Sequence, residues 1–169
     1  MVRRMKRLIW LLVLLTAGLL HAADVPKDAI EQQVADMIAG PQVTIVHFWA
    51  PWCPNCQAEM TPDGWAKFIE ANPAVKVVFV NAWHKGQDPA PKLSAAGLGA
   101  QPNLLLLTHP NASRLEADRL KAFLGLPLTW VPTTWVYRAG KLRVAFNYGE
   151  IRFPVLQQMV DDATNKWEH

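Results

Sequence analysis

Apolar residues along this chain gather into short, nearly unbroken runs, a pattern typical of strands that are buried on both faces of a sheet. Residues 43–49 form the first run, rich in β-branched and aromatic side chains, and residues 75–81 form the second, rich in valine. Two later runs, 133–137 and 142–148, flank Arg138-Ala139-Gly140-Lys141, a sequence typical of a tight turn. We therefore predict two buried strands early in the chain and an antiparallel hairpin late in it.

Between the strands, helix formers dominate or apolar positions recur at helical spacing. Pro62-Asp63-Gly64 interrupts the helical stretch after the first strand, so we expect a kink or two helical pieces there. Residues 111–124 place leucines and a phenylalanine between charged residues, which predicts an amphipathic helix that ends at Gly125. The predicted helices cover residues 26–39, 56–60, 65–71, 91–98, 111–124 and 154–167.

The N-terminus has the pattern of a secretory signal peptide. Basic residues precede the apolar run Leu8 to Leu20, and His21-Ala22-Ala23 follows it with small residues. The run has 13 residues, whereas a membrane-spanning helix needs about 20. We therefore predict cleavage near Ala22 or Ala23, with an uncleaved membrane anchor as the alternative.

Charge argues against one class of function. The chain has 17 Lys and Arg residues against 14 Asp and Glu, but Arg3, Arg4, Lys6 and Arg7 precede the cleavage site. The mature chain would carry 13 basic and 14 acidic residues, with no basic patch that favours nucleic-acid binding. The remaining length is enough for one domain with a substantial core. Export would also place the cysteines where disulfides persist.

The only two cysteines, Cys53 and Cys56, lie where the first strand is followed by a helix. At a helix start, unpaired N–H groups and the positive end of the helix dipole favour a thiolate, which makes Cys53 the candidate nucleophile. Pro54 suits the first helical turn, and Cys56 follows about one turn further on, close enough to form a disulfide. Cys56 is then the resolving thiol of a redox-active pair.

Two other interpretations of this pair are open. One is a structural disulfide, although so short a loop constrains the unfolded chain little. The other is a metal site, which usually needs a second cysteine pair or a histidine pair at metal-ligand spacing. The histidines of this chain are scattered singly, so we expect no metal and no other cofactor.

Two stretches of the chain resemble motifs of the thioredoxin superfamily. The active-site signature is similar to Phe48-Trp49-Ala50-Pro51-Trp52-Cys53-Pro54-Asn55-Cys56, and the next residues, Gln57-Ala58-Glu59-Met60, are similar to the TlpA/ResA/CcmG branch of bacterial extracytoplasmic thiol-disulfide reductases. The cis-proline strand of the superfamily resembles Val131-Pro132-Thr133-Thr134-Trp135-Val136. The resemblance begins near Val43 and runs to the C-terminus. Together with the N-terminal pattern, it gives three parts: a signal peptide (1–23), an N-terminal helix and lead-in (24–42) and a thioredoxin-like domain (43–169).

This resemblance implies an α/β thioredoxin-like fold, with a central mixed β-sheet flanked by helices. It leaves 75 residues between Cys56 and Pro132, more than a minimal thioredoxin uses. We therefore expect an extra β-α insertion before the cis-proline, with Leu104 to Thr108 as its strand. The resemblance also implies that a cis Val131-Pro132 bond brings Pro132 beside the cysteines. Four residues are then expected to bind substrate: Trp52, Pro54, Asn55 and Val131.

Two ionisable residues near the cysteines are further candidates for catalysis. His47 occupies the position at which thioredoxins carry a buried acid, and we hypothesise that the neutral ring accepts the Cys56 proton. The alternative is a core histidine that one hydrogen bond satisfies. Glu59 lies three residues after Cys56 and is a candidate proton relay, with an ordinary exposed helix glutamate as the alternative.

We predict a periplasmic thiol-disulfide oxidoreductase, monomeric, that reduces disulfides of exported proteins. The resemblance implies a membrane thiol reductase of the DsbD or CcdA type as electron donor, and it admits cytochrome c maturation as a pathway. One alternative is a DsbA-like oxidant or isomerase, which the lack of a histidine between the cysteines disfavours. Another is a copper-binding assembly chaperone that uses Cys53, Cys56 and a histidine such as His109.

Overall fold

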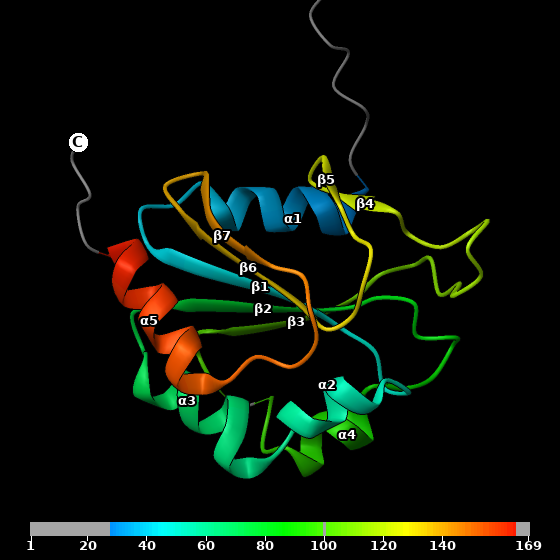
Figure 1. Ribbon diagram of the computed structural model, residues 1–169, viewed down its shortest axis with the longest axis horizontal. Helices are drawn as coiled ribbons and strands as arrows, with labels where there is room; N and C mark the ends of the chain where they lie inside the picture. The colour runs from blue at the N-terminus through cyan, green and yellow to red at the C-terminus, as the bar shows by residue number, and fades with distance from the viewer. Residues whose placement is uncertain (1–27, 100, 165–169) are drawn as a thin grey trace, which may run out of the picture.

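A five-stranded mixed sheet forms the centre of the protein, whose computed structural model describes residues 28–99 and 101–164 (Figure 1). The strands lie in the order β3-β2-β1-β6-β7. Their bounds are β1 (Val43–Trp49), β2 (Lys76–Asn81), β3 (Leu104–Thr108), β6 (Thr133–Arg138) and β7 (Lys141–Phe146). β1 to β3 are mutually parallel, whereas β6 is antiparallel to β1 and β7. The predicted strand at 104–108 and the predicted hairpin are therefore confirmed.

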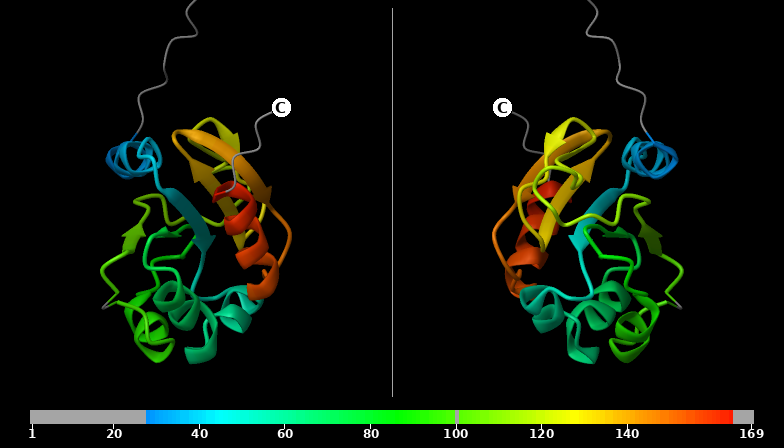
Figure 2. Two further views of the ribbon diagram at one scale, coloured as in Figure 1. Left: turned by 90° about the vertical axis from the view of Figure 1, so that its left-hand side faces the viewer. Right: turned by 90° about the vertical axis from the view of Figure 1, so that its right-hand side faces the viewer.

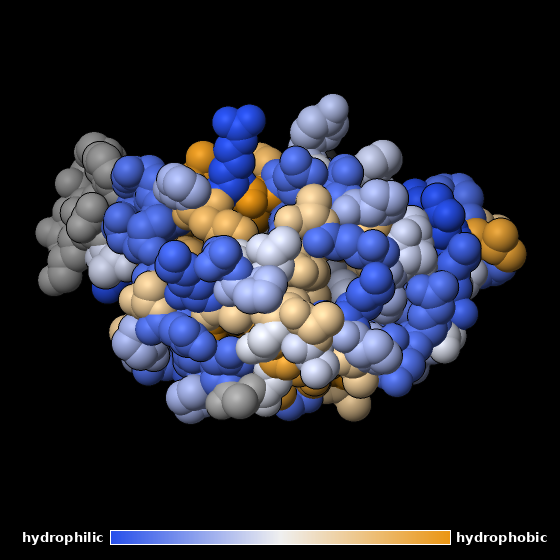
Figure 3. All heavy atoms as spheres, turned by 90° about the horizontal axis from the view of Figure 1, so that it is seen from below, coloured by the Kyte–Doolittle hydropathy of each residue, from blue (hydrophilic) through white to orange (hydrophobic). Residues whose placement is uncertain are grey.

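Helices lie on both sides of this sheet (Figures 1 and 2). One side carries α1 (Ala29–Ile38) and a two-stranded hairpin of β4 (Ala122–Phe123) and β5 (Leu126–Pro127). The other elements are α2 (Pro54–Glu59), the wide turn η1 (Pro62–Ala66), α3 (Lys67–Ala71), α4 (Ala90–Ala95) and α5 (Phe153–Thr164). On the face that α2, α3 and α4 form, apolar residues lie in small groups among hydrophilic ones (Figure 3).

Strand β1 is buried along its whole length because both of its faces are covered. On one face the His47 ring contacts Trp65 and Phe79, with ring centroids 4.6 Å and 4.9 Å away. On the other face Phe48 packs edge-on against Phe123 and Trp135, at 5.1 Å and 4.6 Å. The strand that precedes the cysteines is thus fixed by aromatic packing on both sides.

The predicted break after the active-site helix is present. Gly64 has non-helical dihedrals (φ −92°, ψ −116°), and a Cβ there would lie 2.4 Å from the backbone oxygen of Glu59. Only glycine permits this close approach of the two backbones. The turn directs Trp65 into the core, where its indole reaches the end of α2.

The amphipathic helix predicted at 111–124 is wrong. Residues 111–121 form an open loop with one helical turn, in which the N–H groups of Asp118 and Arg119 donate to the carbonyl of Leu115, and β4 follows. Asn111 holds the loop, because its side chain accepts from Ser113 N–H and donates to the Asp118 carbonyl. Such side-chain bonds compete with helix formation.

The apolar residues that suggested this helix differ in their burial. The Leu115 side chain is 70% exposed, whereas Phe123 is buried in β4. Leu124 and Gly125 both have positive φ (50° and 73°), which is the geometry of a two-residue hairpin turn. The insertion before the cis-proline therefore contains α4, the predicted strand β3, the loop and the β4–β5 hairpin, but no helix after β3.

Two predictions fall outside the described ranges. The signal peptide and Trp167, placed at the end of the last helix, are not among residues 28–99 and 101–164. Within those ranges, no helix is long and apolar enough to cross a bilayer.

Candidate active site

The two cysteines lie at the N-terminal end of α2. Cys53 caps this helix, and its sulfur accepts a hydrogen bond from the backbone N–H of Cys56 at 3.2 Å. Pro54 occupies the first helical turn, as predicted. The two sulfurs are not bonded to each other in this structure; Cys53 is 4% exposed and Cys56 is fully buried. Cys53 is therefore the sulfur nearer to solvent.

The surroundings of the two thiols move their pKa values in opposite directions. The hydrogen bond with the Cys56 side chain lowers the pKa of Cys53 to about 7 against the effect of burial, assisted by backbone N–H groups and by the charge of Arg114. Burial raises the pKa of Cys56, and the neighbouring Cys53 raises it further. Near neutral pH about half of the molecules therefore carry a thiolate on Cys53, while Cys56 keeps its proton.

The start of β6 lies directly beside Cys53. The Val131-Pro132 bond is cis, as the resemblance implied, and the Val131 carbonyl accepts a hydrogen bond from the Cys53 thiol at 3.4 Å. When Cys53 ionises to a thiolate, it loses the proton that it donates in this hydrogen bond. The cis-proline segment is thus located where the resemblance predicted it, with Val131 next to the Cys53 sulfur.

A groove of about 350 Å³ opens beside Cys53. It contains all four predicted substrate-binding residues, and its full lining is Trp52, Cys53, Pro54, Asn55, Trp83, Arg114, Arg119, Thr129, Trp130 and Val131. A larger hollow of about 440 Å³ lies at the β3 edge, lined by residues such as Met37 and Leu105, and does not include either sulfur. The groove is therefore the candidate substrate site.

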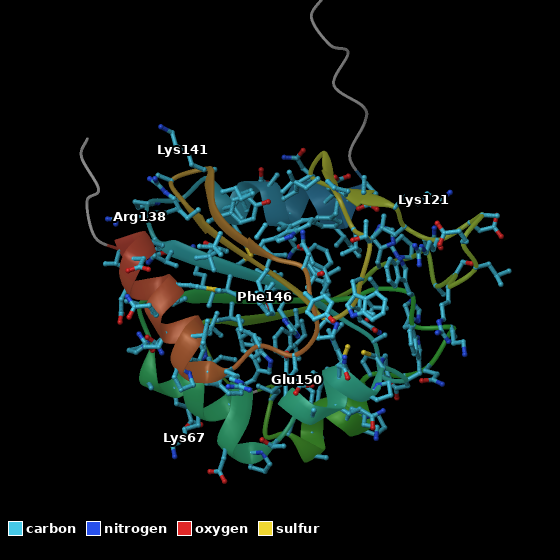
Figure 4. All side chains as sticks on the ribbon, viewed as in Figure 1. Lys67, Lys121, Arg138, Lys141, Phe146 and Glu150 are labelled. Carbon is cyan, nitrogen blue, oxygen red and sulfur yellow. The ribbon has the colours of Figure 1, made fainter. Side chains whose placement is uncertain are left out.

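A buried acid lies beneath the cysteines, and it comes from α2. Glu59 is only 3% exposed, so the alternative of an exposed glutamate is wrong. Its carboxylate accepts hydrogen bonds from the Trp65 indole at 3.0 Å and from the backbone N–H of Ile151. The segment around Glu150 that supplies this N–H runs beside α2 (Figure 4). Burial raises the pKa of Glu59 to about 7, although both hydrogen bonds oppose the shift.

His47 shares this buried space with Glu59. Burial lowers the pKa of His47 to about 3, so the ring is neutral at physiological pH. Its Nδ1 atom lies 2.9 Å from the Thr134 hydroxyl, and its Nε2 atom lies 3.3 Å from Oε2 of Glu59. If the hydroxyl donates to Nδ1, the single ring proton is on Nε2, which lies near the carboxylate without the alignment of a hydrogen bond. Both nitrogens thus face groups other than Cys56.

The histidine of the copper-site alternative is engaged elsewhere. Nδ1 of His109 accepts the N–H of Asn111 at 3.1 Å, and Nε2 lies 2.6 Å from the Asp28 carboxylate that caps α1. Residues 28–99 and 101–164 contain no group of three or more His, Cys, Asp and Glu side chains arranged to hold a metal ion.

Comparison with known proteins agrees with this geometry. The sequence model of the thioredoxin-like domain matches residues 30–164. The chain belongs to the thioredoxin-like family. No curated protein sequence matches significantly.

Solved thioredoxin-like structures share the fold at low sequence identity. A secreted Mycobacterium tuberculosis disulfide oxidoreductase homologous to E. coli DsbE is 23% identical, with a TM-score of 0.54, over 73% of this chain and 84% of that one. A secreted thiol-disulfide isomerase from Corynebacterium glutamicum is 23% identical, with a TM-score of 0.54, over 76% and 75%. StoA from Bacillus subtilis is 22% identical, with a TM-score of 0.50, over 70% and 82%.

Within this thioredoxin-like site, sequence reasoning missed Trp83, Arg114 and Arg119. The two arginines belong to the segment predicted as a helix, which would have directed them along a helix face. His109-Pro110-Asn111 is rich in turn-forming residues and was the available signal for a loop. Trp83 follows β2 and has a positive φ of 53°, a conformation that the sequence does not predict.

Proposed function

We propose that this chain is an extracytoplasmic thiol-disulfide reductase whose Cys53–Cys56 dithiol reduces disulfides of exported proteins. The observation that carries the proposal is the contrast between the two thiols: Cys53, with its pKa lowered to about 7, faces the groove, and Cys56, with its pKa raised, is buried behind it. The accessible, more acidic thiol suits attack on a substrate, and the buried, protonated one does not compete for that substrate.

In the first step the Cys53 thiolate attacks one sulfur of a substrate disulfide. A bond forms between Cys53 Sγ and that sulfur, the substrate S–S bond breaks, and the second substrate sulfur leaves as a thiolate. The Val131 carbonyl, which accepts from Cys53 in the resting thiol, borders the site of attack. The residues Trp52, Pro54 and Asn55 line the groove that would hold the substrate chain.

In the second step Cys56 must lose its proton and attack Cys53 Sγ. We assign Glu59 as the acceptor of that proton, because it is buried near the pair and its pKa of about 7 matches neutral pH. The new Cys53–Cys56 bond releases the first substrate sulfur as a thiolate. Two electrons thus pass from the dithiol to the substrate.

His47 then contributes to this proton transfer indirectly, through its contact with Glu59. Its neutral ring lies between Thr134 and the carboxylate, so it orients Glu59 and favours the ionised form that accepts a proton. This differs from the initial hypothesis that His47 takes the Cys56 proton itself. It is a positioning role.

The oxidised pair needs an external dithiol to be reduced again. We assign a membrane thiol reductase of the DsbD or CcdA type to this step, and a periplasmic location reached through the N-terminal signal peptide. The secreted proteins among the structural neighbours support the location. Cytochrome c maturation is one pathway that such a reductase serves.

Equilibration with glutathione tests the direction of electron flow. A reductase should have a potential near that of thioredoxin, about −270 mV, rather than that of DsbA, about −120 mV. A value above about −180 mV, that of protein disulfide isomerase, would overturn the reductase and favour the oxidant or isomerase. A Cys56→Ser variant should accumulate the mixed disulfide with a substrate protein, whereas a Cys53→Ser variant should not.

A further inference from the structure

Two arginines lie on the wall of the groove beside Cys53. The Arg114 guanidinium lies 4.0 Å from the centre of the Trp52 ring, and that of Arg119 lies 4.6 Å from the Trp83 ring. Lys85 adds a third positive charge, 5.7 Å from Trp52. Each cation lies over an aromatic face, which restricts its position, and the N–H groups of Arg114 stay available for a ligand.

Hydrogen bonds hold this wall in place. The Trp52 indole donates to the Trp83 carbonyl at 2.6 Å, and the Trp83 indole donates to the Leu120 carbonyl at 2.9 Å. The backbone N–H of Lys85 donates to the Ala112 carbonyl at 2.8 Å. These bonds tie the loop at 111–120 to the active-site turn. The arginines are therefore pre-organised rather than carried on a loose loop.

The charge of this wall is largely unbalanced. The groove lining contains two arginines and no acidic residue. Arg119 pairs with Glu116 at 2.6 Å, but within the described residues Arg114 forms no ion pair. The nearby nucleophile is itself negative when ionised, and Arg114 contributes to its low pKa. The three cations thus outnumber the two negative groups, Glu116 and the Cys53 thiolate, and one positive charge remains for a partner.

We propose that this groove selects disulfides whose half-cystine lies beside Asp or Glu in an extended segment of an exported protein. Arg114 is the main specificity residue, since its planar guanidinium can bind a carboxylate through two hydrogen bonds. Trp130, 51% exposed at the groove, offers an apolar contact for a neighbouring side chain of such a segment. The proposal rests on the reductase function proposed above and names its substrate class.

Matched peptides test this selectivity. Three peptides that differ only in the residues flanking one cysteine, Glu, Gln or Lys, are each linked through a disulfide to neutral 2-thiopyridine. The release of pyridine-2-thione gives the rate for the reduced protein, divided by the rate for dithiothreitol to remove intrinsic differences. Exposed ion pairs contribute at most about 1 kcal/mol, so the Glu peptide should react about threefold to fivefold faster than the Gln peptide. The Lys peptide should react more slowly than both.

Variants separate the contribution of Arg114 to substrate binding from its effect on the pKa of Cys53. Arg114→Gln raises the Cys53 pKa and slows all peptides, but only a binding role brings the Glu:Gln ratio to about one. Glu116→Gln frees Arg119 and should raise the ratio. Lys141→Gln removes a charge at the β6–β7 turn, at the other end of the sheet (Figure 4), and should leave it unchanged. An equal ratio in the parent and Arg114→Gln, or a parent ratio of one, would overturn the proposal.

Binding without turnover distinguishes this proposal from the proposed function. The same peptides with serine in place of cysteine are titrated into the oxidised protein, and tryptophan fluorescence is followed. Tighter binding of the Glu peptide, lost in Arg114→Gln, supports the groove selectivity even if the reductase assay fails. Reduction of all peptides at equal normalised rates would retain the reductase and reject the selectivity. A stronger Arg114 dependence with glutathione disulfide than with any peptide would reject a protein segment as the ligand.

Discussion

Nε2 of His47 lies 3.3 Å from Oε2 of Glu59, and both side chains are buried. His47 comes from the central strand β1 and Glu59 from the last turn of the active-site helix α2. The strand position at which thioredoxins carry an acid is thus occupied by a neutral ring, and the acid enters the same region from the helix. Proton transfer from Cys56 should therefore follow the titration of Glu59.

Replacement of Glu59 by Gln tests the acid directly. With a pKa of about 7, Glu59 becomes ionised between pH 6 and 8, so the parent should resolve a mixed disulfide faster as pH rises through this range. Loss of a general base costs roughly a hundredfold or more. Glu59→Gln should remove the rise near pH 7 and slow resolution by at least about tenfold in stopped-flow measurements. Glu70→Gln, an exposed acid on α3, is the matched control. Identical pH profiles in the parent and Glu59→Gln would remove Glu59 from the mechanism.

Replacement of His47 by Asn should move the pH dependence rather than abolish it. Asn keeps a polar atom near the Thr134 hydroxyl but lacks the Nε2 edge that faces Glu59. The ionised carboxylate loses a stabilising neighbour, so the midpoint of the resolution rate should move above pH 7. The mixed disulfide then forms normally and is released slowly at pH 6 to 7.

Two outcomes would decide against this positioning role. Equal rates in His47→Asn and the parent from pH 6 to 9 would make His47 a core residue only. A rate independent of pH in His47→Asn, with the Glu59→Gln profile unchanged from the parent, would make His47 itself the base. The amide of His47→Gln can reach the Nε2 position. If this variant restores the parent's pH midpoint of the resolution rate, the result supports the role of His47 in positioning Glu59.

The parts of the site that the sequence predicted are those fixed by short-range rules. Cys53, Pro54 and Cys56 lie within one helical turn, so the start of a helix after a buried strand determines their geometry. The burial of Glu59 depends on Gly64, which folds η1 back over α2, and no local pattern reports that contact. Arg114 reaches the groove through side-chain bonds of Asn111 that outweigh helical periodicity. Specific contacts that hydrophobic periodicity does not encode decided these positions.

The Cys56 side chain should tune the acidity of Cys53. Its hydrogen bond is the largest contribution that lowers the pKa of Cys53 to about 7. In a Cys56→Ala variant, the midpoint of iodoacetamide alkylation of Cys53 should therefore rise toward the ordinary thiol value. Arg143→Gln, an exposed charge on β7, should leave the midpoint unchanged. Preferential alkylation of Cys56 in the parent at acidic pH would reverse the assigned roles.

The buried Glu59 should also shape the pH dependence of stability. Its pKa of about 7 in the folded protein lies above the ordinary value of 4.5, so the folded state binds this proton more tightly than the unfolded chain. The resulting stabilisation is complete below pH 4.5 and is lost as pH rises through 7. Relative to the parent, Glu59→Gln should gain free energy of unfolding between pH 4.5 and 7, by an amount on the order of 3 kcal/mol. A difference between the two proteins that stays constant across urea titrations from pH 4.5 to 8 would contradict this.

His47 should act on stability with the opposite sign. Burial lowers its pKa from 6.5 to about 3, so the folded protein binds this proton less tightly than the unfolded chain does. The stabilisation that neutral His47 provides is present above pH 6.5 and is lost as pH falls toward 3. His47→Asn cannot be protonated there, so its free energy of unfolding should improve relative to the parent as pH falls from 6.5 to 4. Urea unfolding of both proteins with a phosphine reductant present measures this. Because Glu59→Gln should improve as pH rises, the two variants should show opposite slopes relative to the parent, and parallel slopes would contradict one of the two pKa shifts.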